Sequence, residues 1–560
     1  MATKDTGIIT ARELLDVLIG HGVKDIVLSP GSRNTPLLLG CASREQLRKH
    51  VINDERTAAF SALGIAMASQ RPVALACTSG TALYNYAPAI AEAFYQKIPL
   101  IVITADRPVS VTGQVPQTLR QPEALRNITK ASFDIPVQSS WNEENLSGYF
   151  GTNLQWFTNR VANEALNLAT SGIKGPVHIN VQFEVPFNTT ILYEEREVRI
   201  VKNFPCDYPL PAEICRDIAE ELNGRKVLVV VGQMPSDHKL NKALTSFSGL
   251  SNVMVLSEPT SNLHLEPYNI FTGEIYEDLS GEKDEALRPD VIITLGGLIV
   301  SDALNKFIKA SSNADIWTLG DTPLELDRYH NLTRHYEVSP LRFFRGITSM
   351  TNHLLRKKKI INKSEYRDLW IKRHREGLMR FERKISEDVW SELNAVSYIM
   401  DFLPSDYNLF VSNGMMIRNV FGVTRRMPHN LWANRGVSGI EGTNATAFGT
   451  SLSYKGTTVL LTGDMSFSYC PEILNLHRMG GDLRIIVVNN GGGDIFRKIA
   501  TTRELECREE YFCNAPELPL EKLAKAYGWN YQKADSLETL EKSLKHFISN
   551  PKSIIEVFVK

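Results

Sequence analysis

The sequence predicts an α/β fold made of three consecutive domains with mostly parallel sheets. Strand-like apolar runs alternate with helix-like segments, and glycine-rich turns follow several of the strands. A chain of 560 residues is also too long for a single hydrophobic core. Hydrophobic residues make up 43% and charged residues 22% of the chain, which is typical of a globular protein.

The first domain is expected over residues 1–190. Its elements alternate along the chain, with strands at 25–29, 51–53, 73–77 and 100–104 and helices at 56–69 and 81–95. This βαβα alternation indicates a parallel sheet with helices on both faces. The turn 30–32 follows the first strand, and ligands bind at such strand ends in open α/β sheets.

Two further α/β domains are expected after a linker rich in Thr, Glu and Arg that ends near Pro211. The central domain covers 205–355, with strands at 226–231, 253–256, 291–295 and 316–319. A basic linker covers 356–385, and the third domain covers 386–560. We interpret the basic stretch 356–383 as a solvated connecting helix, and a phosphate or nucleic-acid patch is the alternative.

The bulk properties exclude several classes of function. The net charge is −1, so no global basic field attracts nucleic acid. No apolar run reaches the length of a membrane span, and the N-terminus lacks a signal-peptide pattern, so we expect a cytoplasmic protein. The seven cysteines form no C-x-x-C pair, which favours free thiols over a zinc site. Cys77 and Cys470 lie near the motifs below, but no paired histidine pattern marks either as a nucleophile.

The most informative stretch runs from Gly463-Asp464 to Asn489-Asn490. An acidic residue leaves one strand-like run and an amide leaves the next, with the spacing of a strand–helix–strand unit. Carboxylate, amide and carbonyl oxygens are ligands that suit Mg²⁺ or Ca²⁺, and the glycines at 491–493 allow close approach to a phosphate. An ordinary βαβ unit with a polar turn is the alternative.

Glu55 stands where a short strand gives way to an alanine-rich helix. A carboxylate at a helix start is favoured by the helix dipole, which is one explanation. The other is a buried glutamate that hydrogen-bonds a nitrogen heterocycle in a dry site. Small residues follow it, namely Ala58, Ala59 and Ala62, and they allow the helix to pack closely against a partner surface.

Together these features resemble thiamin-diphosphate enzymes of the pyruvate-decarboxylase and acetolactate-synthase type. That family has a glutamate after the second strand of its first domain and G-D…N-N in its third. The local sequence resembles that of the branch of the family that acts in menaquinone biosynthesis. The similar segments are 28–37, 54–60, 104–108, 413–418 and 434–442. The resemblance spans roughly the whole chain and is weaker in the central domain.

The resemblance implies a transferase that uses thiamin diphosphate with Mg²⁺, or with Mn²⁺ as an alternative ion. It would decarboxylate 2-oxoglutarate and add the succinyl unit to isochorismate. Two alternatives remain: another carboligase or decarboxylase of acetolactate-synthase type, and a non-catalytic protein of the same fold. A P-loop or dinucleotide enzyme is disfavoured, because Gly31-Ser32-Arg33 is not followed by G-K-[ST].

The resemblance also implies roles for individual residues. Glu55 would activate the cofactor through its aminopyrimidine ring, and Ile440 would support the bent cofactor. The cation would be held by Asp464, Asn490 and Gly492. The rest of the cofactor pocket would be lined by Met465, Ser466, Gly493, Ile495 and Phe496. Substrate carboxylates would be bound by Ser32, Arg33, Arg107, Gln117, Arg418 and Arg435. The catalytic group would comprise Glu55, Arg33, Gln117, Arg418 and Arg435.

Two departures from the family pattern stand out. Many relatives have Asn-Ser where this chain has Asn413-Gly414, so a hydroxyl near the cofactor is lost. Relatives often carry a lysine in the central domain where this chain has Asp302, and Lys306 is only a weak substitute. By analogy with the family, we expect a homodimer or homotetramer with active sites between subunits.

Overall fold

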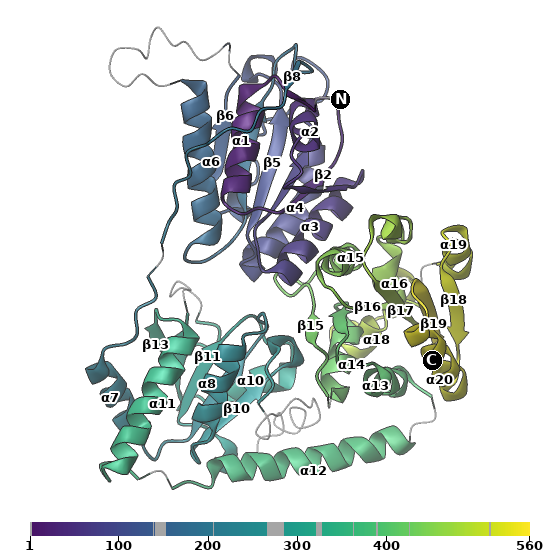
Figure 1. Cartoon of the computed structure of the whole chain (residues 1–560). Helices are drawn as coiled ribbons and strands as arrows, with labels where there is room; N and C mark the ends of the chain where they lie inside the picture. The colour runs from purple at the N-terminus through teal and green to yellow at the C-terminus, as the bar shows by residue number, and fades with distance from the viewer. Residues whose placement is uncertain are drawn as a thin grey trace. The chain divides into compact units, whose positions relative to one another are not determined.

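The computed structural model describes residues 3–137, 139, 153–204, 206–265, 285–320, 327–361, 363–387, 390–424, 426–514 and 517–559. Three large sheets and a two-stranded sheet form the framework of these residues (Figure 1). They divide into two compact units. The first contains the described residues up to 204, together with 436–455 and 469–483. The second contains the described residues of 206–435, 456–468 and 484–559.

The first large sheet has six strands in the order β3-β2-β4-β5-β7-β6, all paired in parallel. The strands are β2 (Asp25–Leu28), β3 (Arg48–Val51), β4 (Val73–Cys77), β5 (Leu100–Asp106), β6 (Ser132–Ile135) and β7 (Val177–Gln182). The chain crosses from one side of β2 to the other after β3. The carboxyl ends of β2 and β4 therefore flank a switch point, where parallel α/β sheets bind ligands.

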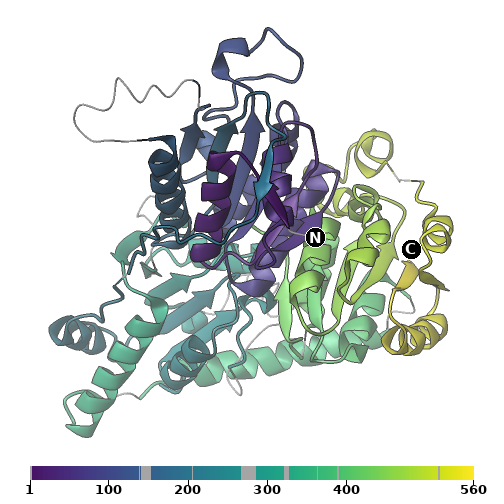
Figure 2. The same ribbon diagram turned by 45° about the horizontal axis from the view of Figure 1, so that its top comes forward.

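Helices cover both faces of this sheet (Figures 1 and 2). One face packs against α1 (Ile9–Gly20), α2 (Thr35–Ala42) and α6 (Leu154–Thr170) through a continuous apolar core. The other face packs against α3 (Glu55–Ser69) and α4 (Ala82–Gln96). Every residue of β4 and β5 is buried, as expected for central parallel strands covered on both sides.

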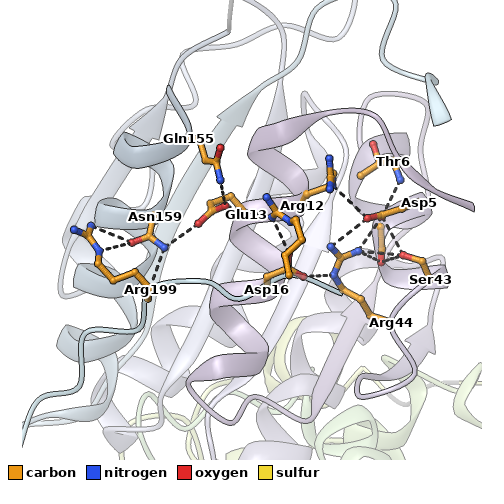
Figure 3. A network of polar contacts seen from close by, with 12 residues as sticks. Asp5, Thr6, Arg12, Glu13, Asp16, Ser43, Arg44, Gln155, Asn159 and Arg199 are labelled. Atoms are coloured by element: carbon orange, nitrogen blue, oxygen red, sulfur yellow. Dashed lines mark hydrogen bonds and ion pairs between the residues drawn. The ribbon is translucent and has the colours of Figure 1, made fainter. Parts of the chain in front are cut away.

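A buried polar network ties the N-terminal strand β1 (Lys4–Thr6) to the helices of the first unit (Figure 3). Arg44, only 1% exposed, donates to Asp5 at 2.9 Å and to Asp16 at 2.7 Å. Glu13 of α1 accepts from Asn159 of α6 at 2.8 Å. Because each buried charge has a partner, removal of one would leave its partner uncompensated. β1 also pairs antiparallel with β8 (Thr190–Leu192).

The central sheet has five parallel strands in the order β10-β9-β11-β12-β13. They are β9 (Val227–Val231), β10 (Val253–Ser257), β11 (Val291–Leu295), β12 (Asp315–Leu319) and β13 (Leu332–Tyr336). One face packs against α7 (Ala212–Glu221), α8 (His238–Ser248) and α11 (Pro340–Arg356). The other packs against α10 (Asp302–Ala310) and α12 (Tyr366–Glu387).

The basic stretch 356–383 is largely helical, as predicted. It covers the end of α11 and most of α12, the long helix of Figure 1. Its aromatic residues Tyr366 and Trp370 are buried against the central sheet, and Phe381 joins the core beneath the third sheet. Lys357, Lys358 and Lys359 are exposed. The stretch is therefore helical, but it is not solvated on all sides, because its aromatic residues are buried in two cores.

The third large sheet has six strands in the order β15-β14-β16-β17-β19-β18. They are β14 (Asn408–Val411), β15 (Asn430–Trp432), β16 (Thr458–Gly463), β17 (Leu483–Asn489), β18 (Asn530–Ala534) and β19 (Ser553–Phe558). The helices packed on its core are α13 (Glu392–Phe402), α14 (Met415–Val423) and α20 (Leu537–Ser549). The switch point of this sheet lies between β14 and β16, the same position in the strand order as in the first sheet.

The predicted elements agree with the structure to within a few residues, with one shift. The strand expected at 51–53 is β3, which covers Arg48–Val51. Its register against β2 pairs Leu28 with Val51 and ends there, and Asp54 then caps α3 by accepting from the Thr57 amide at 2.7 Å. Asn53 and Asp54 therefore belong to the turn and helix cap.

Two of the expectations from the sequence concern the cysteines and membrane-spanning helices. All seven cysteines are free thiols. Across the described ranges, no helix is long and apolar enough to cross a bilayer.

Candidate cofactor and substrate site

Asp464 and Asn490 follow neighbouring strands, β16 and β17, as the spacing predicted. The Asp464 side chain is buried, and its Oδ1 accepts from the Met465 amide at 2.8 Å. Its Oδ2 accepts from the Gly492 amide at 2.9 Å, which brings the glycine turn after β17 to the end of β16. Burial raises the pKa of Asp464, and the two backbone N–H groups oppose that shift.

The Asn490 side chain carries an oxygen without a partner. Its Oδ1 is buried and accepts no hydrogen bond, while its Nδ2 faces Glu392 Oε2 at 3.3 Å. A buried polar atom without a partner is uncommon, and this oxygen has its full capacity to bind a cation. The Gly492 carbonyl accepts from the Asp494 amide at 2.9 Å and keeps a second lone pair.

The donor chemistry of this edge fits a hard divalent cation. It combines a carboxylate, a side-chain amide oxygen and a backbone carbonyl, which Mg²⁺ accepts. In the part of the chain that the structure describes, no group of three or more His, Cys, Asp or Glu side chains is gathered to hold a metal. Gly492 has φ of 119°, a conformation that L side chains rarely adopt, so a glycine is required there.

The remaining residues predicted to line the cofactor pocket lie around this edge. Met465 and Ser466 belong to the short helix α16 (Asp464–Ser468). Gly493 packs tightly, because an added Cβ would lie 2.8 Å from the Phe496 ring and 3.0 Å from the Phe512 carbonyl. Ile495 and Phe496 form the start of α18 (Ile495–Lys498).

The Asn413-Gly414 departure has a conformational reason. Gly414 has φ of 87° and ψ of −136°, where a serine would be strained. A hydroxyl is nevertheless present at this edge, because Ser412 Oγ accepts from the Gly463 amide at 3.2 Å. The hydroxyl that relatives carry after the asparagine is thus not restored at 414, but a buried one stands two residues earlier.

Arg418 and Arg435 both contact the turn after β14. Arg418 is exposed and donates to the Gly414 carbonyl at 2.7 Å. Arg435 is half-buried and donates to Asn413 Oδ1 at 3.0 Å. The structure therefore brings these two predicted substrate arginines to one strand end, beside the switch point of the third sheet.

A buried carboxylate, Glu258, lies within electrostatic range of Arg435. Glu258 follows β10 and accepts from the amides of Val300 and Ser301, each at 2.8 Å. Burial raises the pKa of Glu258 to about 7, and the two amides, Arg435 and Arg328 oppose the shift. Glu258 was not predicted, because its partners lie far along the chain in the loop between β11 and α10.

In the first unit, Glu55 is the first residue of α3 and is half-buried. Its carboxylate accepts no hydrogen bond from any residue that the structure describes. It lies close enough to Cys77 and Tyr86 that its charge raises the pKa of both groups. Burial is the larger cause for Cys77 and also raises the pKa of Cys470, so neither thiol is an activated nucleophile.

The small residues of α3 pack against α15 (Thr443–Ser453). The helices come closest at two glycines, Gly64 and Gly449. An added Cβ on Gly64 would lie 2.0 Å from the Thr446 carbonyl, and one on Gly449 would lie 2.0 Å from the Ser61 carbonyl. The predicted alanines Ala58, Ala59 and Ala62 are fully buried on α3.

Arg33 and Arg107 form a cationic pair at the carboxyl end of the first sheet. Arg33 is buried, donates to the Phe183 carbonyl at 2.9 Å and stacks on Phe187 at 4.6 Å. Burial lowers its pKa, and the charge of Arg107 lowers it further. The Nε atoms of both arginines are buried without a partner. Two guanidiniums that lie close enough to repel each other, and that have unused donors, are suited to an anion such as a carboxylate.

The neutral donors predicted beside this pair are both exposed. Ser32 lies in the turn after β2. Its neighbour Gly31 is required there, because an added Cβ would lie 2.4 Å from Thr78. Gln117 has a left-handed φ of 58° and lies against Gly80, the turn after β4.

Ile440 lies in the loop between β15 and α15. The amides of Gly436 and Val437 in this loop donate to the two carboxylate oxygens of Glu92, a residue of α4 that is 1% exposed. An added Cβ on Gly436 would lie 2.5 Å from the Glu92 carbonyl. Glu92 was not predicted, because nothing local to α4 distinguishes it from a surface glutamate.

The central-domain departure has an ordinary structural explanation. Asp302 is the first residue of α10, where a carboxylate is favoured by the helix dipole, and Ser301 caps the same helix. Asp302 and Lys306 are both exposed. At the switch point of this sheet, the turn at Gly232 packs against Gly297. A Cβ added to Gly232 would lie 2.1 Å from the Gly297 carbonyl oxygen.

Comparison with known proteins identifies the family. Two family models match, described as thiamine pyrophosphate enzyme, N-terminal TPP binding domain (residues 9–127) and C-terminal TPP binding domain (residues 412–557). A relative from Porphyromonas gingivalis named 2-succinyl-5-enolpyruvyl-6-hydroxy-3-cyclohexene-1-carboxylate (SEPHCHC) synthase is 34% identical, covering 96% of this chain and 92% of its own. Synthases of the same name from Cytophaga hutchinsonii (32%, 96% and 93%) and Desulfotalea psychrophila (30%, 97% and 96%) are also similar.

The chain belongs to the SEPHCHC synthase family. The predicted resemblance and the thiamin-diphosphate-binding fold are thereby confirmed. The two matched segments contain the predicted glutamate and the predicted Gly463-Asp464…Asn489-Asn490 stretch. Within the first unit, the structure brings Arg33 to Arg107. Within the second, it brings Asp464 to Gly492, and Arg418 and Arg435 to one turn.

Proposed function

We propose that this protein catalyses the decarboxylation of 2-oxoglutarate and the 1,4-addition of the resulting succinyl unit to isochorismate. The products are SEPHCHC and CO₂, in menaquinone biosynthesis. The observation that carries the proposal is the similarity to synthases of that name over 96–97% of this chain. The arginines at the strand ends support it, because the two substrates together bring several carboxylates.

Thiamin diphosphate with Mg²⁺ is the proposed cofactor, and Mn²⁺ is an alternative ion. When bound, the cofactor supplies a thiazolium ring that accepts the electrons released as CO₂ leaves. The proposed cation ligands are Asp464, the Asn490 side-chain oxygen and the Gly492 carbonyl. The unpartnered Oδ1 of Asn490 supports this assignment.

Glu55 is the proposed partner of the cofactor's aminopyrimidine. A carboxylate that accepts no hydrogen bond from the described residues keeps its full capacity for such a ligand. Its carboxyl group would hydrogen-bond the pyrimidine ring nitrogen and hold a proton there. This would favour the tautomer of the ring that removes a proton elsewhere on the cofactor. Ile440 would support the cofactor's shape as an apolar contact.

The cationic groups would orient the two substrates. Arg33 and Arg107, with unused buried Nε donors, are proposed to bind a carboxylate, assisted by Ser32 and Gln117. Arg418 and Arg435 would bind a second one at the other strand end. Such bidentate contacts hold the reacting carbons in position, which lowers the entropy cost of joining two substrates.

We propose a homo-oligomer, with a dimer as the minimal active unit and Glu55 reaching a cofactor held by the neighbouring subunit. We also propose domain boundaries near residues 190, 205, 355 and 386. The three large sheets, at 25–182, 227–336 and 408–558, are compatible with these boundaries.

A product assay tests the proposed reaction. The purified protein with thiamin diphosphate and Mg²⁺ is incubated with 2-oxoglutarate alone, with 2-oxoglutarate and isochorismate, and with pyruvate. We expect the coupled product only when both proposed substrates are present. Turnover of pyruvate alone would instead indicate an acetolactate-synthase-type enzyme, and no turnover with cofactor bound would indicate a non-catalytic member of the fold.

A further inference from the structure

The orientation of the Asn490 amide is determined by a residue outside the family motifs. Asn490 Nδ2 lies 3.3 Å from Glu392 Oε2. An amide nitrogen only donates and a carboxylate only accepts, so this contact distinguishes the two ends of the amide. The other end of the amide is Oδ1, which is buried and has no hydrogen-bond partner among the described residues.

Glu392 is itself held in place from several sides. It is 6% exposed and is the first residue of α13, where the helix dipole favours a carboxylate. The Ser391 hydroxyl caps the same helix by accepting from the Asn394 amide at 3.2 Å. Lys498 Nζ lies 3.9 Å from Glu392 and 2.6 Å from Asp494, both beside the glycine turn after β17. The carboxylate is therefore a fixed acceptor.

We propose that Glu392 is a positioning residue of the cation site, which keeps the Asn490 amide turned so that its oxygen serves as a ligand. Without Glu392, the amide could turn over and present its nitrogen, which cannot bind a cation. Replacement of a residue that orients a metal ligand in this way typically lowers metal affinity by about 10- to 100-fold. The proposal rests on the cation site proposed above.

Metal binding by the full-length protein tests the proposal directly. Titration of Mg²⁺ in the presence of thiamin diphosphate is followed by calorimetry, and Mn²⁺ binding by electron paramagnetic resonance. We expect Glu392→Ala to weaken binding by about 10- to 100-fold and Glu392→Gln to weaken it less, because glutamine accepts from Nδ2 but does not exclude the reversed amide. Glu213→Gln is the matched control: it removes an exposed carboxylate from the first turn of α7 and should change nothing.

A double-mutant cycle separates orientation from general damage. In the Asn490→Asp background both ends of the side chain are oxygens, so orientation no longer matters. There, Glu392→Ala should not weaken metal binding further. Equal losses in both backgrounds, or wild-type affinity in Glu392→Ala and Glu392→Gln, would overturn the proposal. If the wild type binds no cation, or Asp464→Ala binds as the wild type does, the proposed cation site itself is wrong.

Discussion

The position of Glu55 has both a structural and a functional explanation. It begins α3, where any carboxylate is favoured, and yet it accepts no hydrogen bond from the described residues and remains partly exposed. Its side chain therefore contributes little to the fold beyond the helix dipole, about 0.3–1 kcal/mol for an exposed site. Replacement of Glu55 can therefore test its functional role without disturbing the fold.

Replacement of Glu55 by glutamine should remove most activity and leave the fold unchanged. General acid–base groups contribute about 10²- to 10⁴-fold, so we expect a loss of at least that order in product formation. The thermal unfolding midpoint should stay near that of the wild type. Glu45→Gln, at an exposed glutamate of the same unit, is the control. Retention of activity in Glu55→Gln would exclude the proposed role.

Glu258 predicts a pH dependence of stability. Burial raises the pKa of its carboxyl from an ordinary 4.5 to about 7. Between these values the folded protein binds a proton that the unfolded chain releases, so stability falls as pH rises from about 4.5 to about 7 and levels off above. The total change is roughly 3 kcal/mol, from 1.36 kcal/mol for each unit of pKa.

Denaturant unfolding across this pH range, compared between the wild type and Glu258→Gln, isolates that contribution. Glutamine keeps an acceptor for the amides of Val300 and Ser301 but does not titrate. The wild type should lose stability relative to Glu258→Gln as pH rises through this window. A difference that is constant with pH would mean that the carboxyl titrates normally.

At the scale of elements, the close approach of α3 and α15 depends on reciprocal glycines. Gly64 and Gly449 each admit a carbonyl of the facing helix, and backbone cannot rotate away as a side chain can. Alanine is intrinsically better than glycine in a helix by about 1 kcal/mol. Here the contact dominates, because overpacking typically costs about 1–3 kcal/mol and an overlap with backbone is among the worst cases.

Gly64→Ala and Gly449→Ala should therefore each lower the unfolding midpoint. The control is Gly422→Ala in α14, where an added Cβ meets nothing within 4 Å. That change should be neutral or slightly stabilising, because only the helix propensity is altered. If Gly64→Ala behaved like Gly422→Ala, the two helices would not be in the tight contact described.

At the scale of the whole molecule, all three large sheets share one arrangement of strand order. In each sheet, the second strand along the chain pairs with one side of the first strand, and the third strand pairs with the other side. The switch points therefore lie between β2 and β4, between β9 and β11, and between β14 and β16. The switch point of the first sheet is flanked by the turn with Ser32 and Arg33, and that of the third by Asn413 and Asp464. At the central one, Gly232 and Gly297 pack against each other.

A mixed dimer tests whether active sites form between subunits. Glu55→Gln and Asp464→Ala chains, each inactive alone, are co-expressed with different tags and the mixed species is purified. If each site combines one chain's Glu55 with its partner's Asp464, one of the two sites is wild-type, and we expect about half the wild-type activity. An inactive mixed dimer would mean that each site is built within one chain.

Much of the fold and part of the site were predictable from local pattern. Strand-like runs, alanine-rich helices and glycine turns determined the parallel α/β class, because side-chain periodicity and backbone freedom are local properties. Asp464, Asn490 and Glu55 could be singled out because each directly follows a strand or begins a helix. Arg33 could be singled out because it lies in the turn between β2 and α2. The end of β3 shifted, since its register against β2 decides where the strand stops.

Local sequence patterns and motifs were enough to predict the fold class, the family and the residue types at the strand ends. Which residues lie near one another depends on the tertiary fold. The fold brings Arg33 within electrostatic range of Arg107, and Arg435 within range of Glu258. It also joins Asn490 to Glu392 and the Ile440 loop to Glu92 by hydrogen bonds. These pairs could not be predicted, because strand order and helix packing select the partner of a buried polar group. Those long-range choices leave no local periodicity in the chain.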